Sequence, residues 1–440
     1  MKYIYGLNIS GESILKYFQA NKTPFVAWDD NEKTREKIKK KYNPKLESHQ
    51  NVNWTKIKEV YLTPGISLDN KNFSKIKNKV NIYRDLQLYS KIAKNKIIVA
   101  VTGTNGKSTT VKLIGDIIKE EKKKCFVGGN IGTPLLDFCL KNKNTKHHII
   151  ELSSFQLESA PSFKSHVSIL LNISRDHVDR YKNFKDYAKT KEKIINIKKN
   201  KYNVVCIDDP YSKKIYNKYI KKNNLIGIST KTKLKNGIYL KNKIIHDNYF
   251  ENKQINLDVI SRDLNNKYNE VNILATYVTG KILKINENTI LSTFKKYKGL
   301  PHRAETIYQN EKLLVINNSK ATNLDSALKT IESYKNTYLI IGGRVKTKDF
   351  RVFNKVKKNI NKCYIIGEST EFIYKQVSNF FKSYKSFTLD VAVNSIFKHI
   401  KKDKKKLSIV LAPACESYDQ FLNFQDRGNH FKKLIKTNIK

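Results

Sequence analysis

A short glycine-rich segment holds the residues best suited to bind a phosphate. The apolar run Val99–Val101 is typical of a buried strand, and it leads into Gly103, Thr104, Asn105, Gly106, Lys107, Ser108 and Thr109. Where a strand turns into a helix in this way, backbone N–H groups and the helix N-terminus point at phosphate oxygens. Lys107 can neutralise phosphate charge and the Ser108 hydroxyl can ligate Mg²⁺, tasks that an ordinary strand-to-helix turn would not need. The segment predicts an ATP-binding loop, although Val101 stands where the common pattern G-x-x-x-x-G-K-[ST] has its first glycine.

Two further segments carry metal-binding side chains directly after apolar runs. Glu151 follows His148-Ile149-Ile150, and His177 lies shortly after Ser168–Leu171. In a doubly wound sheet, ligands bind at the carboxyl ends of the strands. Mg²⁺ takes few protein carboxylates beside phosphate oxygens and water, so Glu151 and His177 form a sensible pair near a γ-phosphate. Taken alone, Glu151 also fits a surface carboxylate and His177 a structural histidine. Together with the ATP loop, the two residues predict a metal site.

The elements around these segments predict an α/β protein of three domains, because 440 residues exceed what one core accommodates. Residues 2–30 have a strand, turn, helix and strand pattern, with the helix at Ser13–Ala20, which indicates a Rossmann-like unit. We place this domain at 1–90. A central P-loop-type domain with a mainly parallel sheet follows at 91–297, and a second Rossmann-like α/β domain at 298–440.

The expected strands of the later domains are apolar runs that alternate with helical patterns. They are Ile97–Val101, His147–Glu151, Val167–Asn172 and Asn203–Asp208, then Leu313–Ile316, Tyr338–Ile341, Cys363–Ile366 and Ser408–Leu411. Residues 230–262 alternate like strands and contain many turn residues, so they predict a peripheral β insertion.

Composition argues for a cytoplasmic protein without a polyanionic partner. The net charge is +46, from 85 Lys+Arg against 39 Asp+Glu, but the excess is mostly Lys and spreads along the whole chain. Abundant Asn, Ile and Tyr accompany it, as in an AT-rich coding sequence, so we expect no nucleic-acid partner. The five cysteines include no C-x-x-C pair, which indicates reduced thiols. The first residues lack the charged-then-apolar pattern of a signal peptide and no apolar run approaches the ~18 residues of a membrane span, so no membrane association is expected.

Several of these segments together resemble the Mur ligase family. They are the loop at 103–109, an expected turn at Gly128-Gly129-Asn130-Ile131-Gly132, the run Glu151–Glu158 and the run Asp176–Tyr181. The likeness extends over about residues 3–435. Three C-terminal motifs, Asn317–Asn323, Gly342–Lys346 and Leu411–Phe421, resemble those of the D-glutamate-adding branch of the family.

The resemblance implies a ligase that uses ATP to join D-glutamate to UDP-N-acetylmuramoyl-L-alanine, through an acyl phosphate, in peptidoglycan precursor synthesis. We also expect a monomer. Lys107, His177 and Lys191 would be catalytic, and two Mg²⁺ ions would be held by Ser108, Glu151, His177 and Lys191, the last as a carbamylated lysine. Besides residues 103–109, the nucleotide would contact Asn269, Asn272, Arg303 and Asn318. The substrates would contact Ser10, Asp29, Gly65, Asn130, Ser153, Lys320, Thr322, Lys346, Ser417 and Phe424.

Four positions depart from the family pattern. Asn8 replaces the middle glycine of an N-terminal Gly-x-Gly-x-x-Gly, Asn318 an aspartate and Tyr268 a histidine, and Val345–Thr347 lacks the usual acidic and small residues. None removes an expected metal ligand or Lys107, so we expect lower affinity rather than lost activity. We also expect Lys298–Arg303 to act as a hinge that closes the C-terminal domain on the central one.

Three alternatives stay open on the sequence alone. One is a different amide ligase of the same family, such as a folylpolyglutamate synthase or a later muramyl ligase. Another is a P-loop ATPase that binds nucleic acid through its lysine excess. The third is a regulatory paralogue without activity, suggested by Asn318 and Tyr268.

Overall fold

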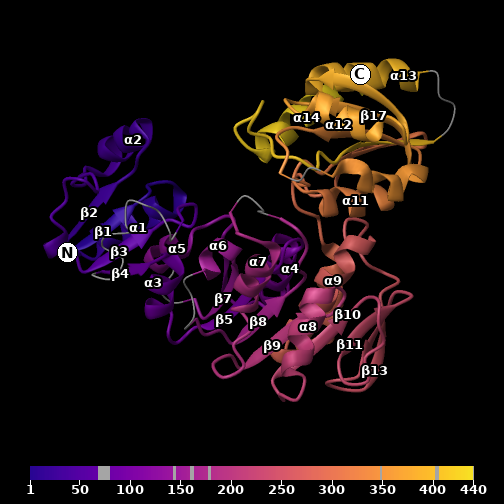
Figure 1. Cartoon of the computed structure of the whole chain (residues 1–440). Helices are drawn as coiled ribbons and strands as arrows, with labels where there is room; N and C mark the ends of the chain where they lie inside the picture. Colours follow the sequence, from indigo (N-terminus) through magenta and orange to yellow (C-terminus); the bar gives the residue numbers. More distant parts are fainter. Residues whose placement is uncertain are drawn as a thin grey trace. The chain divides into compact units, whose positions relative to one another are not determined.

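The computed structural model describes residues 1–67, 80–141, 145–158, 163–176, 180–346, 349–401 and 406–439. They form three sheets with flanking helices, so the expected α/β class is confirmed (Figure 1). The chain divides into two compact units. The first comprises Met1–Ile173, Lys185–Leu257 and Val271–Thr293, and the second Ser174–Phe184, Asp258–Glu270 and Phe294–Lys440. The first unit contains two of the sheets; the domain boundaries near residues 90 and 298 stay predictions.

The N-terminal sheet has four parallel strands in the order β2-β1-β3-β4. Its elements are β1 (Lys2–Tyr5), α1 (Ile9–Ala20), β2 (Phe25–Trp28), α2 (Glu32–Tyr42), the 3-10 helix η1 (Trp54–Lys56), β3 (Glu59–Leu62), β4 (Asn81–Tyr83) and α3 (Asp85–Ile92). The predicted strand-helix-strand unit is therefore present, but its helix begins at Ile9, four residues before the expected Ser13. Asn8 caps it, and the Glu12 N–H already donates to the Asn8 carbonyl at 2.8 Å, so the second half of the glycine-containing turn is helical.

The central sheet has nine strands in the order β13-β12-β11-β10-β9-β8-β5-β7-β6. The strands are β5 (Ile97–Thr102), β6 (Cys125–Gly129), β7 (His147–Glu151), β8 (Val167–Leu170), β9 (Tyr202–Cys206), β10 (Leu225–Ser229), β11 (Ile238–Lys241), β12 (Ile244–Asp247) and β13 (Lys253–Asn256). The helices are α4 (Lys107–Glu120), α5 (Leu135–Lys141), α6 (Ser154–Leu157), α7 (Phe184–Glu192), α8 (Pro210–Tyr219), η3 (Lys267–Asn269), α9 (Glu270–Ile282) and α10 (Glu287–Lys296).

The region expected as a peripheral β insertion extends this central sheet. β11 continues the parallel array beside β10, and β12 and β13 add to it as antiparallel strands. The segment is peripheral, as predicted, but its strands form the edge of the main sheet rather than a separate element. Gly128 and Gly129, expected in a turn, lie instead at the end of β6.

The C-terminal sheet has six strands in the order β14-β15-β19-β16-β17-β18, all parallel except for the β14–β15 pair. The strands are β14 (Glu305–Gln309), β15 (Leu313–Asn317), β16 (Thr337–Gly342), β17 (Ile360–Ile366), β18 (Lys382–Phe387) and β19 (Leu407–Leu411). The helices are α11 (Leu324–Glu332), the 3-10 helix η4 (Phe350–Asn359), α12 (Thr370–Val377), α13 (Leu389–Ile400) and α14 (Phe424–Ile439).

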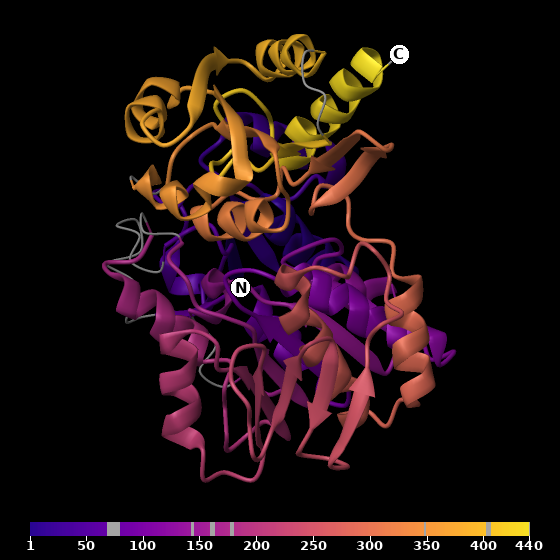
Figure 2. The ribbon, with the colours of Figure 1, turned by 90° about the vertical axis from the view of Figure 1, so that its right-hand side faces the viewer.

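Helices cover both faces of the C-terminal sheet, as Figure 2 shows in orange and yellow. Residues of α11, η4 and α12 pack on one face, and residues of α13 and α14 on the other. A strand covered on both faces reads as an uninterrupted apolar run, and this explains why the sequence predicted β15, β16, β17 and β19. Among the residues that the structure describes, no helix combines the length and apolar character needed to cross a membrane.

Candidate active site

The predicted ATP loop connects β5 to α4 at the carboxyl edge of the central sheet. β5 lies between β7 and β8, so the residues that follow these three strands meet at one edge. Gly106 caps α4 with φ +87°, and a Cβ built there would lie 2.4 Å from Asn272 Oδ1. Both the backbone conformation and the close approach of Asn272 therefore require glycine.

Lys107 lies over the loop that precedes it. Its Nζ donates to the carbonyl oxygens of Gly103 at 2.9 Å and Thr104 at 2.8 Å. Lys107 is also the first residue of the 14-residue helix α4, so the side chain starts at the helix N-terminus. A phosphate at this place would meet both the helix N-terminus and a nearby ammonium group.

Three predicted site residues meet directly beside the loop. The Ser108 hydroxyl donates to Glu151 Oε2 at 2.6 Å, and Asn130 Nδ2 donates to Glu151 Oε1 at 3.0 Å. Ser108 and Glu151 are each only 2% exposed. A hydroxyl and a carboxylate held this close, with a buried negative charge, match the oxygen ligands that Mg²⁺ prefers. The residues present thus fit the predicted metal, and Ser108 and Glu151 are the side chains that could hold it.

Lys191 reaches the same loop from α7. It is 2% exposed and is the only buried lysine in the part of the chain that the structure describes. Its Nζ donates to the Gly103 carbonyl at 2.8 Å and lies 4.9 Å from the centre of the Tyr187 ring. Tyr187 in turn places its hydroxyl 3.0 Å from Thr104 Oγ1. The chain has 76 lysines, and burial distinguishes Lys191 from the other lysines that the structure describes.

Two asparagines hold the loop from outside it. Asn172, just after β8, accepts from the Asn105 N–H at 2.9 Å and returns a bond from Nδ2 to the Asn105 carbonyl at 3.1 Å. Asn272, predicted to contact the nucleotide, accepts from Thr110 Oγ1 at 3.1 Å. Sequence reasoning did not assign a role to Asn172, although its place at the end of a predicted strand was a usable signal.

Other predicted residues of the first unit have structural partners. Ser153 caps the short helix α6 and accepts from the Gln156 N–H at 3.2 Å. Asp29, at the end of β2, accepts from the Leu7 N–H at 2.6 Å and so shapes the turn that leads to Ser10. Gly65 is exposed, and a Cβ built there meets nothing within 4 Å. His177 lies outside the described residues.

Asn8 needs no glycine-like backbone. Its φ is −67°, within the ordinary extended region, and its side chain is exposed. The structural glycines of this turn are its neighbours: a Cβ on Gly11 would lie 1.8 Å from the Gly6 carbonyl oxygen. The tolerance of asparagine for positive φ therefore plays no part at this position.

In the second unit, the residues predicted for D-glutamate lie on adjoining loops. Lys346 Nζ pairs with Glu416 Oε1 at 2.8 Å, and Asp176 Oδ1 lies 3.8 Å away. The Ala414 N–H donates to the Ala321 carbonyl at 2.8 Å, which joins the loop of Thr322 to that of Ser417. Lys320 Nζ lies 4.0 Å from the centre of the Phe424 ring. Asp176 was not assigned a role from sequence, and Asn323 Nδ2 donates to it at 3.3 Å.

Arg427 ties these loops together and was also missed. It is 1% exposed, and its guanidinium donates to Ser319 Oγ at 3.0 Å, the Ser319 carbonyl at 2.9 Å, the Cys415 carbonyl at 3.1 Å and the Glu416 carbonyl at 3.2 Å. Burial lowers the pKa of Arg427 to about 10. The signal was its residue type, because only nine of the 85 basic residues are arginine.

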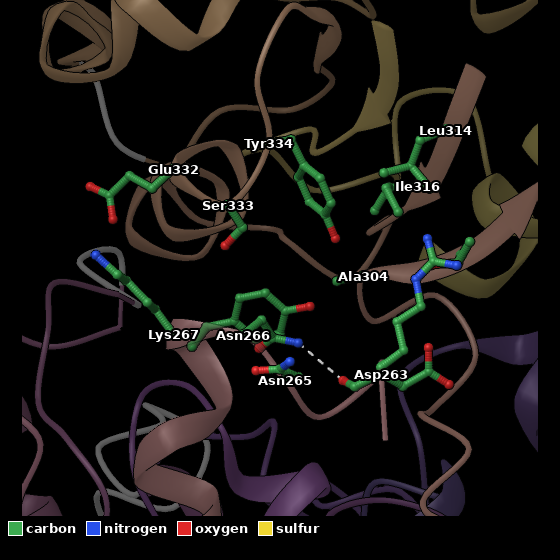
Figure 3. Close-up of a pocket in the computed structure, with 13 residues that line it drawn as sticks. Asp263, Asn265, Asn266, Lys267, Ala304, Leu314, Ile316, Glu332, Ser333 and Tyr334 are labelled. Carbon is green, nitrogen blue, oxygen red and sulfur yellow. Dashed lines mark hydrogen bonds between the residues drawn. The ribbon is translucent and has the colours of Figure 1, made fainter. Parts of the chain in front are cut away.

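A pocket of about 460 Å³ lies beside the predicted nucleotide-binding residues of the second unit (Figure 3). Tyr268, Ala304 and Ile316 line it, and each is one or two residues from Asn269, Arg303 or Asn318 in the chain. These three predicted residues do not line the pocket themselves. Asn269 Nδ2 donates to the Asp263 carbonyl at 2.9 Å, and Asn318 Nδ2 to Thr330 Oγ1 at 2.6 Å. Burial raises the pKa of the Tyr268 phenol, which is also hydrogen-bonded to Tyr334.

Comparisons with known proteins identify relatives of nearly the same length. The Mur ligase middle domain matches residues 101–280. A protein named UDP-N-acetylmuramoylalanine--D-glutamate ligase from Rickettsia prowazekii is 34% identical, covering 98% of this chain and 97% of that protein. One of the same name from Caldanaerobacter subterraneus is 34% identical, covering 86% of this chain and 84% of that protein. A solved MurF ligase from Thermotoga maritima in complex with ADP has a similar fold, with a TM-score of 0.62 at 14% identity, covering 94% of this chain and 95% of that chain.

Proposed function

Since the chain belongs to the Mur ligase family, we propose that it is an ATP-dependent, ADP-forming ligase that joins D-glutamate to UDP-N-acetylmuramoyl-L-alanine. The reaction is a step of peptidoglycan precursor synthesis. The observation that carries the proposal is the cluster at the carboxyl edge of the central sheet, where Lys107, Ser108, Glu151 and Lys191 gather around one phosphate-type loop. The nearly full-length relatives that are named for this activity support the choice of substrates.

The cluster suits activation of a carboxylate by phosphate. A free carboxylate does not react with an amine at neutral pH, because the oxygen that must leave is a poor leaving group. Transfer of the γ-phosphoryl group of ATP to the L-alanyl carboxylate gives an acyl phosphate and ADP. The amine of D-glutamate then adds to the acyl carbon, and the tetrahedral intermediate loses phosphate and a proton to give the amide.

Residues around the loop would stabilise the charge that moves in the first step. Lys107 would leave the carbonyls of Gly103 and Thr104 and contact the transferring phosphoryl group. Ser108 and Glu151 would hold one Mg²⁺, and His177 together with a carbamylated Lys191 would contribute to a second. When bound, these ions neutralise phosphate oxygens and so make the γ-phosphoryl group a better acceptor. Asn130 would orient the substrate carboxylate beside Glu151.

The second unit would supply the amine. A dicarboxylate such as D-glutamate needs a cation and several neutral donors. We propose that one of its carboxylates replaces Glu416 as the partner of Lys346, and that Lys320, Thr322, Ser417 and Phe424 complete the site. Asn269, Asn272, Arg303 and Asn318 would contact the adenine nucleotide. Ser10, Asp29 and Gly65 would contact the uridine diphosphate end of the other substrate, and Ser153 would hold the segment that carries Glu151.

We place the reaction in the cytoplasm and propose a monomer that needs no membrane or nucleic-acid partner. Both substrates are small and water-soluble, and the lysine excess is spread along the chain rather than gathered in one run. Light scattering of the purified protein would test the oligomeric state.

One experiment tests the proposed function. Phosphate release should require ATP, UDP-N-acetylmuramoyl-L-alanine and D-glutamate together, in the presence of magnesium and bicarbonate. Lys107→Ala should abolish it. Lys112→Ala is the matched control, because Lys112 lies on the same helix and its partly exposed side chain pairs with Asp116 Oδ2 at 2.6 Å. The rate of this variant should equal that of the natural chain. Phosphate release that ignores the nucleotide sugar or D-glutamate would refute the proposal.

A further inference from the structure

Arg84 connects the turn that carries Gly65 to the segment that carries Glu151. Its side chain is fully buried. One guanidinium nitrogen donates to the Thr63 carbonyl at 2.6 Å, and the other donates to the Ile66 carbonyl at 2.8 Å and to Glu158 Oε2 at 2.8 Å. A single cation thus bonds two backbone oxygens of the turn that follows β3 and the carboxylate of Glu158.

The turn that Arg84 holds is the one predicted to meet the nucleotide sugar. The Ile66 N–H donates to the Thr63 carbonyl at 3.0 Å, which closes a four-residue turn with Gly65 exposed near its tip. The turn also contacts the β1–α1 connection, since a Cβ on Gly6 would lie 2.3 Å from Thr63 Oγ1. A shift of residues 63–66 would therefore disturb Gly65 and the connection that leads to Ser10, two of the proposed contacts with the uridine diphosphate end.

The other end of the link lies close to the phosphoryl-transfer residues. Glu158 directly follows α6, and this helix begins three residues after Glu151. The next residue along the chain from Arg84 makes a second link, because Gln156 Nε2 donates to Asp85 Oδ2 at 2.9 Å. Residues 84–85 therefore contact the segment 151–158 at two points, and only the contact made by Arg84 also reaches the turn.

An arginine at this position is better explained by the need to bond three acceptors than by a gain in stability. Taking a guanidinium out of water is costly, and apolar residues of similar volume often stabilise a core as well or better. Arginine offers a planar fork of five donors that can bond acceptors in different directions, whereas lysine presents one compact ammonium. A residue that must hold two carbonyls and one carboxylate at once has reason to be arginine even in a chain with 76 lysines.

We infer that Arg84 is a positioning residue for the nucleotide-sugar substrate, which holds the Thr63–Ile66 turn at a set distance from Glu151. The inference rests on the proposed function. Its consequence is specific: loss of Arg84 should weaken binding of the nucleotide sugar more than binding of ATP or D-glutamate, because its guanidinium bonds the two carbonyls of the turn that carries Gly65.

The test compares Arg84→Lys and Glu158→Gln with the natural protein and with a control, Lys16→Gln. Lys16 of α1 pairs with Asp137 of α5, so the control removes another ion pair between the N-terminal and central parts without touching the turn. Steady-state rates give KM for each of the three substrates, calorimetry gives the affinity for the nucleotide sugar, and thermal melting reports folding. Charge-assisted hydrogen bonds are strong enough that we expect KM for the nucleotide sugar to rise about tenfold in both variants.

The expected pattern separates positioning from structure. In the two variants, KM for ATP and D-glutamate should stay within about twofold and the calorimetric affinity should fall in step with KM. Lys16→Gln should change neither the three KM values nor the calorimetric affinity. Variants that melt earlier but keep the natural KM for the nucleotide sugar would show a structural role only and overturn the inference. A natural protein that is inactive with these substrates would overturn the proposed function itself, and the inference with it.

Discussion

Replacing Glu151 by glutamine should separate the catalytic role of this side chain from its role in the fold. Glu151→Gln keeps the shape of the residue and removes one negative charge. In the structure the carboxylate is 2% exposed and accepts hydrogen bonds from Ser108 at 2.6 Å and Asn130 at 3.0 Å. The amide oxygen can still accept from Ser108. The exposed Asn130 amide can rotate to accept from the new NH₂ group.

The effect on stability should be small, because two terms oppose each other. Weaker hydrogen bonds to a neutral acceptor cost about 1–2 kcal/mol, while removal of a buried charge returns a similar amount. The net change should stay within about 1 kcal/mol, which corresponds to a Tm shift of about 2–4 °C. The effect on catalysis should be large, since the lost charge is the proposed Mg²⁺ ligand. We expect a fall of at least about 100-fold in kcat/KM, or about 2.7 kcal/mol of transition-state stabilisation.

The assay is phosphate release at saturating magnesium, with thermal melting of the same samples. Asp116→Asn is the control, because it makes the same acid-to-amide change on α4 in an i,i+4 pair with Lys112 that is partly exposed and worth about 0.3–0.5 kcal/mol. Its activity should be unchanged. The reasoning fails if Glu151→Gln retains more than about a fifth of the natural activity, or if activity and Tm fall together as a folding defect requires.

Three further predictions follow from particular contacts. Gly106→Ala should lower Tm, because φ +87° costs an alanine about 1 kcal/mol and its Cβ would lie 2.4 Å from Asn272 Oδ1. The double variant with Asn272→Ala should recover the part of the stability that this steric contact removes. His148→Gln should flatten the pH dependence of Tm, because burial lowers the pKa of His148 to about 4. A lowered folded-state pKa means that the unfolded chain binds the proton more readily. The free energy of unfolding of the natural protein should therefore fall by about 2 kcal/mol between pH 7.5 and 5. Removal of bicarbonate should lower the natural rate reversibly, and Lys191→Ala should be inactive with or without bicarbonate.

Each of these has a clear contrary outcome. A double variant no more stable than Gly106→Ala would mean that backbone strain alone explains the loss. Parallel pH curves for the natural protein and His148→Gln would assign the acid sensitivity to other groups. A rate indifferent to bicarbonate over repeated degassing would argue that Lys191 acts as the amine it is in the structure, bonded to the Gly103 carbonyl at 2.8 Å.

Most of the strands followed from the sequence because they are buried on both faces. β5, β15, β16 and β19 read as apolar runs, and the structure contains them with shifts of a residue or two at their ends. Two of the strands that escaped prediction lack such runs. β18 has the sequence Lys-Ser-Tyr-Lys-Ser-Phe and lies at a sheet edge, and β6 ends in two glycines that indicated a turn.

The sequence by itself determined the phosphate loop and the C-terminal motifs, because each is a contiguous set of residue types whose chemistry does not depend on distant neighbours. Tertiary structure decided which side chains lose their water. Lys191 is one lysine among 76 until α7 brings it to the Gly103 carbonyl. Arg84 and Arg427 acquire roles only where separate loops converge on one guanidinium. Burial and pairing arise from elements far apart in the chain, so no local spacing encodes them.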